Sequence, residues 1–178
     1  MRRKDREMDR SFAIELIDRV AFGVLSVCGE TAPLSVPLSL VREGEVLYFH
    51  SATQGEKVGY LKEGSEVCVV FVGRVQVPEL YSGDELDALM SDPINHHQLL
   101  SRVFTTEFES AVVKGRIFRV EDEPSKAHAL RLICQKYTPE KMNYVEQAIG
   151  SGIAKTMVYG IEMDEISAKR KKFGLDGK

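Results

Sequence analysis

The chain has 178 residues, of which 43% are hydrophobic and 29% are charged, and its formal net charge is −3. This length suits one compact domain with a core, and the composition excludes an intrinsically disordered protein. The slight acidic excess argues against bulk attraction to nucleic acid. The longest uninterrupted apolar run, Val67–Val72, is too short to cross a bilayer, so no membrane segment is expected.

The cysteines and the two chain ends bear on location. The three cysteines lie far apart and form no C-x-x-C pair, and acidic residues rather than an apolar stretch follow the basic start of the chain. These features favour a reduced, cytoplasmic setting. Basic residues gather in Arg2–Lys4 and in Lys169–Lys172. We expect both groups to be solvated tails, with a nucleic-acid patch as the alternative.

The first part of the chain changes from a helical period to a strand period. Ser11–Val20 places its apolar residues largely on one face and predicts a short amphipathic helix. Phe22–Cys28, Leu34–Leu40 and Val46–His50 follow as strands separated by turn residues. Pro37 cannot donate to a ladder, so the second of these strands belongs at an edge or a bulge.

The middle of the chain contains a buried strand and an insertion. A short helix is expected over 56–62, and Val67–Val72, apolar on both faces, predicts a central strand. The alternation stops from 76 to 102, which we interpret as an insertion over the barrel with one or two helical turns. Ser110–Val120 predicts a long strand in which Gly115 marks a bulge or a close approach.

The last part of the chain adds helices and one more strand. Pro124–Tyr137 predicts a helix, Thr138 a helix N-cap, and Pro139–Ile149 the helix that follows. Thr156–Met163 predicts the last strand. Consecutive short strands with helices only at the margins indicate a mainly β, antiparallel barrel, formed as a single domain by residues 1–178.

The junction from Tyr48 to Lys57 suits a phosphate. It joins a strand, a turn of small residues and a helix start, where unpaired backbone N–H groups attract an anion. Ser51 can donate a hydroxyl, and Lys57 can bring a mobile positive charge to the same anion. A plain strand-to-helix connection with Lys57 in solvent is the alternative.

The strand Leu34–Leu40 is a second candidate segment, because Ser35, Pro37 and Ser39 are small and share one face. Small side chains let a planar ring lie against the backbone, whose polar groups can then bond the ring edge. A strand with one merely exposed face has the same pattern, so the residues alone leave both interpretations open.

Among the histidines, His50 stands out because it closes a strand beside the proposed phosphate junction. It can bond a cofactor or act as a proton donor there, or it can be a strand-end histidine satisfied by the backbone. His96 and His97 are adjacent, and no set of cysteine, histidine and aspartate residues nearby has zinc spacing. No metal is therefore expected.

Several segments, taken in order, resemble one protein family. They are Met1–Glu7, Val36–Leu38, Tyr48–Ala52 with Gly55 and Lys57, Phe108–Val112 with Gly115–Arg116, and Met163–Lys169. The ordered set is similar to the pyridoxamine-5′-phosphate-oxidase-like flavoproteins and, within them, to the nitroimidazole-resistance branch. The resemblance implies an antiparallel six-stranded split β-barrel of Greek-key topology, and a homodimer with two flavin sites at the subunit interface.

The resemblance also implies a cofactor and its contacts. The cofactor is FMN or, alternatively, FAD. The basic pattern of Arg170–Gly174 departs from that of true pyridoxamine phosphate oxidases, so vitamin B6 oxidation is not expected. His50 is the residue expected to act in catalysis. Carried over residue by residue, the expected cofactor-binding residues are Val36, Pro37, Leu38 and Ser39 along the ring, His50 and Ser51 beside the ring and the ribityl chain, Lys57 at the phosphate, and Ser110 on a strand near the cofactor.

The function expected from this resemblance is flavin-dependent reduction. No G-x-G-x-x-G follows a strand, so NAD(P)H would bind transiently over the flavin. Electrons would then pass to a small nitroaromatic or quinone-like acceptor. A flavin-binding or storage module without turnover and a haem-binding split barrel are the alternatives.

Overall fold

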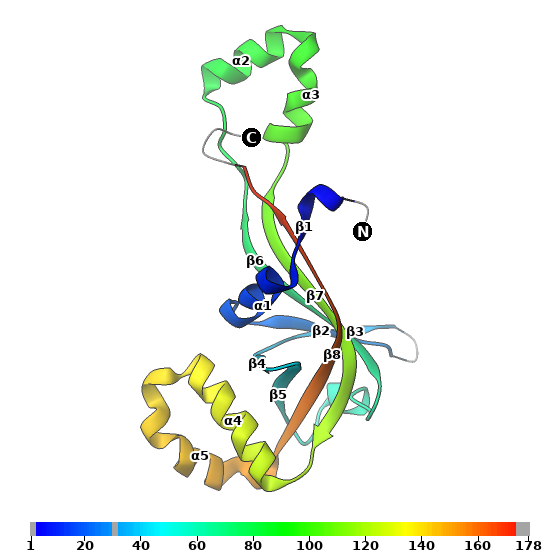
Figure 1. The fold of residues 1–178 in the computed structure, drawn as a ribbon, viewed down its shortest axis with the longest axis vertical. Helices are drawn as coiled ribbons and strands as arrows, with labels where there is room; N and C mark the ends of the chain where they lie inside the picture. Colours follow the sequence, from blue (N-terminus) through cyan, green and yellow to red (C-terminus); the bar gives the residue numbers. More distant parts are fainter. Residues whose placement is uncertain (1–2, 30–31, 174–178) are drawn as a thin grey trace.

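The computed structural model describes residues 3–29 and 32–173, which form one antiparallel sheet with flanking helices (Figure 1). The strands are β1 (Glu7–Met8), β2 (Gly23–Val27), β3 (Leu34–Leu38), β4 (Val41–Glu43), β5 (Val46–Ala52), β6 (Glu66–Gln76), β7 (Glu107–Val120) and β8 (Thr156–Lys171). The α-helices are α1 (Arg10–Arg19), α2 (Gly83–Ser91), α3 (His96–Gln98), α4 (Glu123–Tyr137) and α5 (Val145–Gly152). Short 3₁₀ or π turns are η1 (Lys4–Arg6), η2 (Glu56–Gly59), η3 (Pro93–Asn95), η4 (Leu99–Val103), η5 (Pro139–Tyr144) and η6 (Ile153–Lys155).

The sheet curls into a split barrel because its two ends are neighbours in the chain. Within the described residues it has eight strands in the order β3-β2-β6-β7-β8-β5-β4, and β1 pairs separately with β8. The end strands β3 and β4 are joined only by Ser39 and Leu40, so the two edges must lie close together. The inward side chains form one core, in which the Phe49 and Tyr159 rings stack with centroids 5.2 Å apart.

The predicted antiparallel barrel is confirmed, with eight strands where six were expected. The two additional strands, β1 and β4, have two and three residues, too few to show an alternating pattern. Pro37 lies on β3 at the end of the strand order, as the edge prediction requires. The strand predicted at Val67–Val72 belongs to β6, which lies between β2 and β7 and is therefore central.

The prediction for Gly115 is also confirmed. The pairing of β7 with β8 shifts register between Lys114 and Gly115, which marks a bulge. A Cβ atom added to Gly115 would lie 1.9 Å from the carbonyl oxygen of Glu162. Only glycine therefore fits this crossing of the two longest strands.

The helices cover two separate parts of the barrel. Helix α1 is capped by Asp9, whose carboxylate accepts the Phe12 N–H at 2.9 Å, and it buries Ala13, Leu16 and Ile17 in the main core. Helix α4 packs Ala129 against the outer face of the barrel. Thr138 occupies the predicted N-cap position before Pro139, but its hydroxyl donates to the Cys134 carbonyl at 3.0 Å and makes no capping bond.

The residues after Thr138 also differ from the prediction. The helix expected over Pro139–Ile149 is divided into the 3₁₀ segment η5 and the α-helix α5, which runs on through Gly152. Its Val145 and Ile149 form a small core of their own with Ile153 and part of α4. No helix in the described ranges is both long and apolar enough to pass through a lipid bilayer.

The insertion lies at the tip of a long arm, away from the barrel (Figure 1). We call residues 72–110 and the end of β8 from Lys169 onward the arm, because Ser110 pairs with both Val72 and Lys169 at the last row beside the core. The expectation that the insertion covers the barrel is therefore wrong. It contains more helix than expected, beginning at α2 with a capping box between Ser82 and Glu85.

Candidate functional site

The end of β5 presents its last side chains on opposite faces. Leu47, Phe49 and Ser51 are buried and face the inside of the barrel, whereas His50 and Ala52 are exposed on the outer face. This alternation follows from the pleat of a strand, in which successive side chains point to opposite sides. His50 and Ser51 are therefore adjacent in sequence but do not share a surface.

His50 and Lys57 lie close enough to interact electrostatically. Partial burial lowers the pKa of His50 below its ordinary value, and the positive charge of Lys57 lowers this pKa further. The imidazole is therefore mostly neutral at neutral pH. No salt bridge joins Lys57 to a side chain in the described part of the chain. The structure thus brings together the histidine and the lysine that the sequence singled out.

The segment that carries Lys57 is shorter than predicted. Instead of a helix over 56–62, it is the single 3₁₀ turn η2. Gly55 precedes it with φ of +130°, a conformation that other residues rarely adopt. A turn this short has no helix dipole to attract an anion, so the positive charge here comes from Lys57 itself.

Ser51 occupies the inner face of the same strand end. It is 3% exposed, and its hydroxyl has no hydrogen-bond partner among the described residues. Nearly all buried polar atoms in proteins make a hydrogen bond. The unpaired Ser51 hydroxyl is therefore available to donate a hydrogen bond to a ligand. Ser51 pairs across the sheet with Met157 of β8, which places this hydroxyl near the open end of the barrel.

A cavity of about 650 Å³ opens at this end of the barrel. It is lined by Val58, which directly follows Lys57, and by Met157, the sheet partner of Ser51. Arg119 of β7 contributes a positive charge to the wall, and Glu63 and Glu121 contribute negative charges. Sequence reasoning did not identify Met157 or Arg119, because their position here depends on the register between β7, β8 and β5.

The predicted ring-binding residues lie on β3 and just after it, and they too divide between two faces. Leu38 belongs to the buried core, and Val36 is partly buried against the same core. Pro37 and Ser39 are exposed on the other face. A flat ligand on the outside of this strand would therefore contact Pro37, Ser39 and the backbone rather than the side chains of Val36 and Leu38.

Ser110 lies far from the end of β5 within one chain. Ser110 pairs with Lys169 near the end of β8, whereas Ser51 pairs with Met157 near its start. At a rise of about 3.3 Å per residue, these two rows are separated by roughly 40 Å along the strand. A single chain therefore does not bring Ser110 and Lys57 to one flavin-sized ligand.

The remaining histidines take part in local contacts. His96 and His97 bond through ring nitrogens to the backbone carbonyls of Met90 and Ile94, at 3.1 and 3.0 Å. His128 faces the carboxylate of Glu43. Within residues 3–29 and 32–173, no three histidine, cysteine, aspartate or glutamate side chains are grouped closely enough to hold a metal ion.

A comparison with protein-family models identifies the fold. The family described as pyridoxamine 5′-phosphate oxidase matches residues 9–82 and 84–170. The chain belongs to the pyridoxamine 5′-phosphate oxidase family. A comparison with curated proteins gives no match.

Solved structures of this oxidase family's fold include three informative neighbours. A candidate 5-nitroimidazole antibiotic resistance protein from Bacteroides thetaiotaomicron is 19% identical, with 92% of this chain and 86% of that chain covered and a TM-score of 0.65. The flavocytochrome Anf3 from Azotobacter vinelandii is 19% identical, with 92% and 68% covered and a TM-score of 0.68. An FAD and heme binding protein from Mycobacterium smegmatis is 16% identical, with 94% and 74% covered and a TM-score of 0.70. At these identities the likeness concerns the fold.

Proposed function

We propose that the protein binds FMN, or alternatively FAD, and acts as an oxidoreductase that transfers electrons from NAD(P)H to a small nitroaromatic or quinone-like acceptor. Membership of the oxidase family and the flavin-binding neighbours of the same fold support a flavin. The observation that carries the proposal is the pair formed by the half-buried Lys57 of η2 and the neutral His50 at the end of β5.

The residues at this end of the barrel fit a flavin phosphate and its attached chain. Lys57 would hold the phosphate by a charge-assisted hydrogen bond. Ser51 offers a buried hydroxyl without a partner, beside the cavity that Val58 and Met157 line. Because this hydroxyl faces inward, we assign it to a ligand group inside the cavity and assign the external anion to Lys57.

A bound flavin would supply hydride acceptance and electron transfer. His50 would act from its neutral form as a proton acceptor or hydrogen-bond partner beside the ligand, because burial and the charge of Lys57 lower its pKa. The apolar part of the cavity wall, formed by Val58, Leu61 and Met157, would exclude water from one side of the ligand. These roles belong to residues that the fold brings to one end of the barrel.

We also propose that the active form is a homodimer. Ser110 and Lys57 lie at opposite ends of β8, so both contact one flavin only if they come from different subunits. The arm exposes apolar side chains that a second subunit would cover, among them Val75 at 56% and Phe104 at 73% exposure. We expect an isologous interface above about 2,000 Å². A monomer in light scattering at micromolar concentration, with flavin still bound, would contradict this.

The absorbance spectrum of the purified protein tests the cofactor directly. Flavin absorbance bands whose intensity corresponds to about one flavin per chain support the proposal. An intense haem band in their place overturns it. Anaerobic stopped-flow mixing with NADH and NADPH then separates an enzyme from a storage module. Flavin that stays oxidised with both donors shows that the protein binds the cofactor without this turnover.

The Lys57→Ala variant tests the phosphate contact. We expect FMN affinity to fall about tenfold or more, as the loss of a charge-assisted hydrogen bond predicts. Riboflavin lacks the phosphate and should bind the variant and the parent equally. Lys62→Ala removes a nearby exposed charge and serves as the control. An equal loss of affinity for FMN and riboflavin would show that Lys57 is structural.

The His50→Ala variant tests the proton role. We expect it to retain FMN, to slow flavin reduction or reoxidation, and to flatten any pH dependence near or below the ordinary imidazole pKa of about 6.5. His128→Ala, which removes the exposed partner of Glu43, is the matched control. Parent rates across this pH range in His50→Ala would remove His50 from the mechanism.

A further inference from the structure

The two basic ends of the chain meet in the fold instead of extending as solvated tails. Strand β1 pairs with the end of β8, with Glu7 opposite Lys169. This pairing holds the turn η1 beside the last residues of β8. Arg3 and Arg6 therefore face the same space as Lys171. The expectation of tails is wrong for the described residues, because they belong to or adjoin η1 and β8, whereas Arg3, Lys4, Arg170 and Lys172 are exposed to solvent as expected.

A cavity of about 520 Å³ lies where these ends meet the base of the helical insertion. Its walls come from η1, from η4 and the residues after it, and from the end of β8. The lining includes one acidic residue, Asp5, and five basic residues: Arg3, Arg6, Arg170, Lys171 and Lys172. The cavity is thus strongly positive in a chain whose formal net charge is −3.

The single carboxylate does not neutralise this charge. Asp5 is engaged by Arg3 through two hydrogen bonds of 2.8 and 2.6 Å. Arg6 has a side chain only 25% exposed, and its nearest carboxylate oxygen, on Asp5, is 3.9 Å away. Its guanidinium makes no hydrogen bond to a described residue, so its N–H donors are available to a ligand in the cavity that Arg6 lines.

The contacts and the pKa of Lys171 reflect the same positive surroundings. Its ammonium donates to Thr105 and to the Ser101 carbonyl, which fixes it at the cavity wall. Burial lowers the pKa of Lys171, the charges of Arg6 and Arg3 lower it further, and the charge of Glu107 only partly offsets them. An anion in the cavity would relieve this repulsion.

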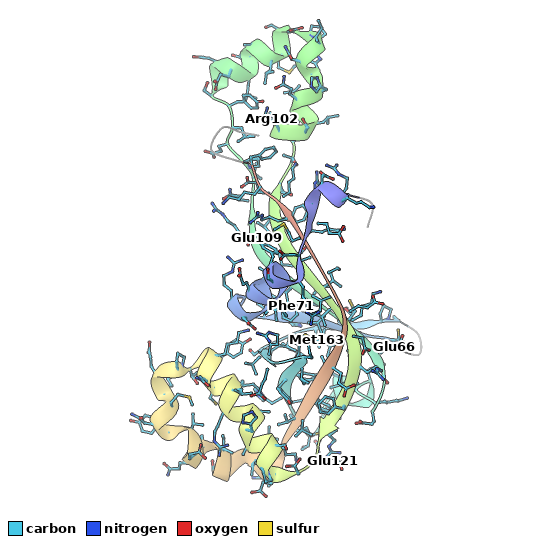
Figure 2. The ribbon with its side chains drawn as sticks, viewed as in Figure 1. Glu66, Phe71, Arg102, Glu109, Glu121 and Met163 are labelled. Atoms are coloured by element: carbon cyan, nitrogen blue, oxygen red, sulfur yellow. The ribbon has the colours of Figure 1, made fainter. Side chains whose placement is uncertain are left out.

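An aromatic wall adjoins the charged one. Phe173 lies under the Lys171 ammonium, 5.0 Å from the ring centroid, and under the Arg102 guanidinium at 6.0 Å. Arg102 stands at the base of the insertion (Figure 2), and its Nε is buried without a partner among the described residues. The site therefore combines a fork-shaped donor, a point charge and an apolar surface within one concave space.

We propose that this cavity binds a small phosphorylated molecule, with Arg6 and Lys171 holding the phosphate and Phe173 packing against the rest of the ligand. Guanidinium and ammonium groups together match the charge and geometry of a phosphate dianion. The site is concave and small, whereas nucleic acid binding uses an extended positive surface. Within one chain it lies at the opposite end of β8 from Lys57, so a variant of Arg6 tests it separately from the proposed phosphate contact of Lys57.

Calorimetric titration of the full-length protein with inorganic phosphate and with pyrophosphate at low salt tests the proposal. We expect saturable binding, tighter for pyrophosphate, and a loss of about tenfold or more in Arg6→Gln. Lys171→Gln should weaken binding similarly. Arg131→Gln removes the same charge from α4, where it pairs with Glu146, and should bind like the parent.

Three outcomes would overturn the proposal. The first is no binding of either anion up to about 10 mM, a concentration at which only contacts of about 3 kcal/mol or less escape detection. The second is an equal loss in Arg6→Gln and Arg131→Gln, which would indicate general electrostatic attraction. The third is tighter binding of a single-stranded oligonucleotide than of pyrophosphate, lost in the same variants, which would indicate an extended nucleic-acid surface.

Discussion

The barrel and the arm share three strands, β6, β7 and β8, yet the side chains of these strands meet different surroundings in the two regions. Inside the barrel, Val69 and Val113 have no exposed surface, and Phe71 is 1% exposed. A few residues farther along β6, Val75 is 56% exposed although its chemistry is the same. A strand therefore does not determine its own burial, because burial depends on what the rest of the chain places over it.

The arm is held mainly by polar contacts where the barrel is held by packing. Glu107 accepts the backbone N–H of Phe173 and the side-chain amide of Gln76. Glu109 accepts from the Arg19 guanidinium at 2.7 Å, which joins the arm to α1. The barrel thus completes its core within one chain, whereas the arm keeps exposed apolar side chains such as Val75 and Phe104.

The largest expected effect compares one phenylalanine in each region. Phe49→Ala should lower the free energy of unfolding by about 3–5 kcal/mol, because it removes a fully buried ring stacked on Tyr159. Phe104→Ala on the arm should change it by about 0.5 kcal/mol or less in the isolated chain. Urea unfolding of both variants measures the difference. A cost for Phe104→Ala that grows with protein concentration would show that a partner subunit covers the arm.

The second comparison uses two glycines. Gly115→Ala places a methyl group against the Glu162 carbonyl and should cost about 1–3 kcal/mol, because backbone must move. Gly83→Ala on the arm has open space within 4 Å at the start of α2 and should be neutral or slightly stabilising. Thermal unfolding of the pair tests this. Equal melting temperatures for the two variants would mean that β7 and β8 can separate at the bulge without cost.

A smaller effect is the dependence of stability on acidic pH, which should differ between the arm and the barrel. The Phe173 N–H and the Gln76 amide lower the pKa of Glu107. Burial alone would raise the pKa of Glu109, but the Arg19 guanidinium and the Arg74 N–H outweigh it and lower this pKa. Both carboxylates therefore stabilise the fold above an unfolded pKa of about 4.3, and this contribution is lost as the pH falls through the folded values.

We consequently expect the arm to loosen before the barrel on acidification below about pH 4.3. Amide hydrogen exchange, followed separately for β7 residues in the arm and in the barrel, measures this order. The Glu107→Gln variant cannot titrate at this position. It should therefore reduce the difference between the pH values at which the arm and the barrel lose hydrogen-exchange protection. Simultaneous loss of protection in both regions would show that they unfold as one unit.

The smallest expected effect lies at the far end of the barrel. Lys57→Gln removes the positive charge beside His50, so the imidazole pKa should rise toward its ordinary value while burial still holds it below. The parent should also lose some stability as the pH falls below about 6.5, because the unfolded state binds the proton more readily. NMR titration of the ring protons measures the shift. An unchanged pKa in Lys57→Gln would place the two side chains farther apart in solution.

Much of the barrel could be predicted from local sequence, because buried and exposed positions alternate along its strands. Pro37 marked an edge and Gly115 marked a bulge for steric reasons that act within a few residues. The full length of β8 was not predicted, because beyond Met163 its side chains are mostly polar and show no clear apolar alternation. The direction of the arm was also not predicted, because it depends on how far two paired strands continue past the core.

The candidate site was predictable only in its local part. The pattern around Lys57 indicated an anion contact, and the structure brings His50 close to it. The neighbouring Met157 and Arg119 depend on strand register, which no local pattern specifies. The meeting of Arg6 with Lys171 depends on the two-residue strand β1, which is too short to be seen in the sequence.

The position of β8 has a consequence for how the protein is made. This strand pairs with β7, β5 and β1, so it completes both the barrel and the arm, yet it follows every other described element in the chain. During synthesis, β5 and β7 must wait with unpaired edges until residues 156–171 have left the ribosome. Folding of the barrel should therefore be a late event that depends on contacts distant in sequence, and chaperones that shield strand edges should associate with the nascent chain during this interval.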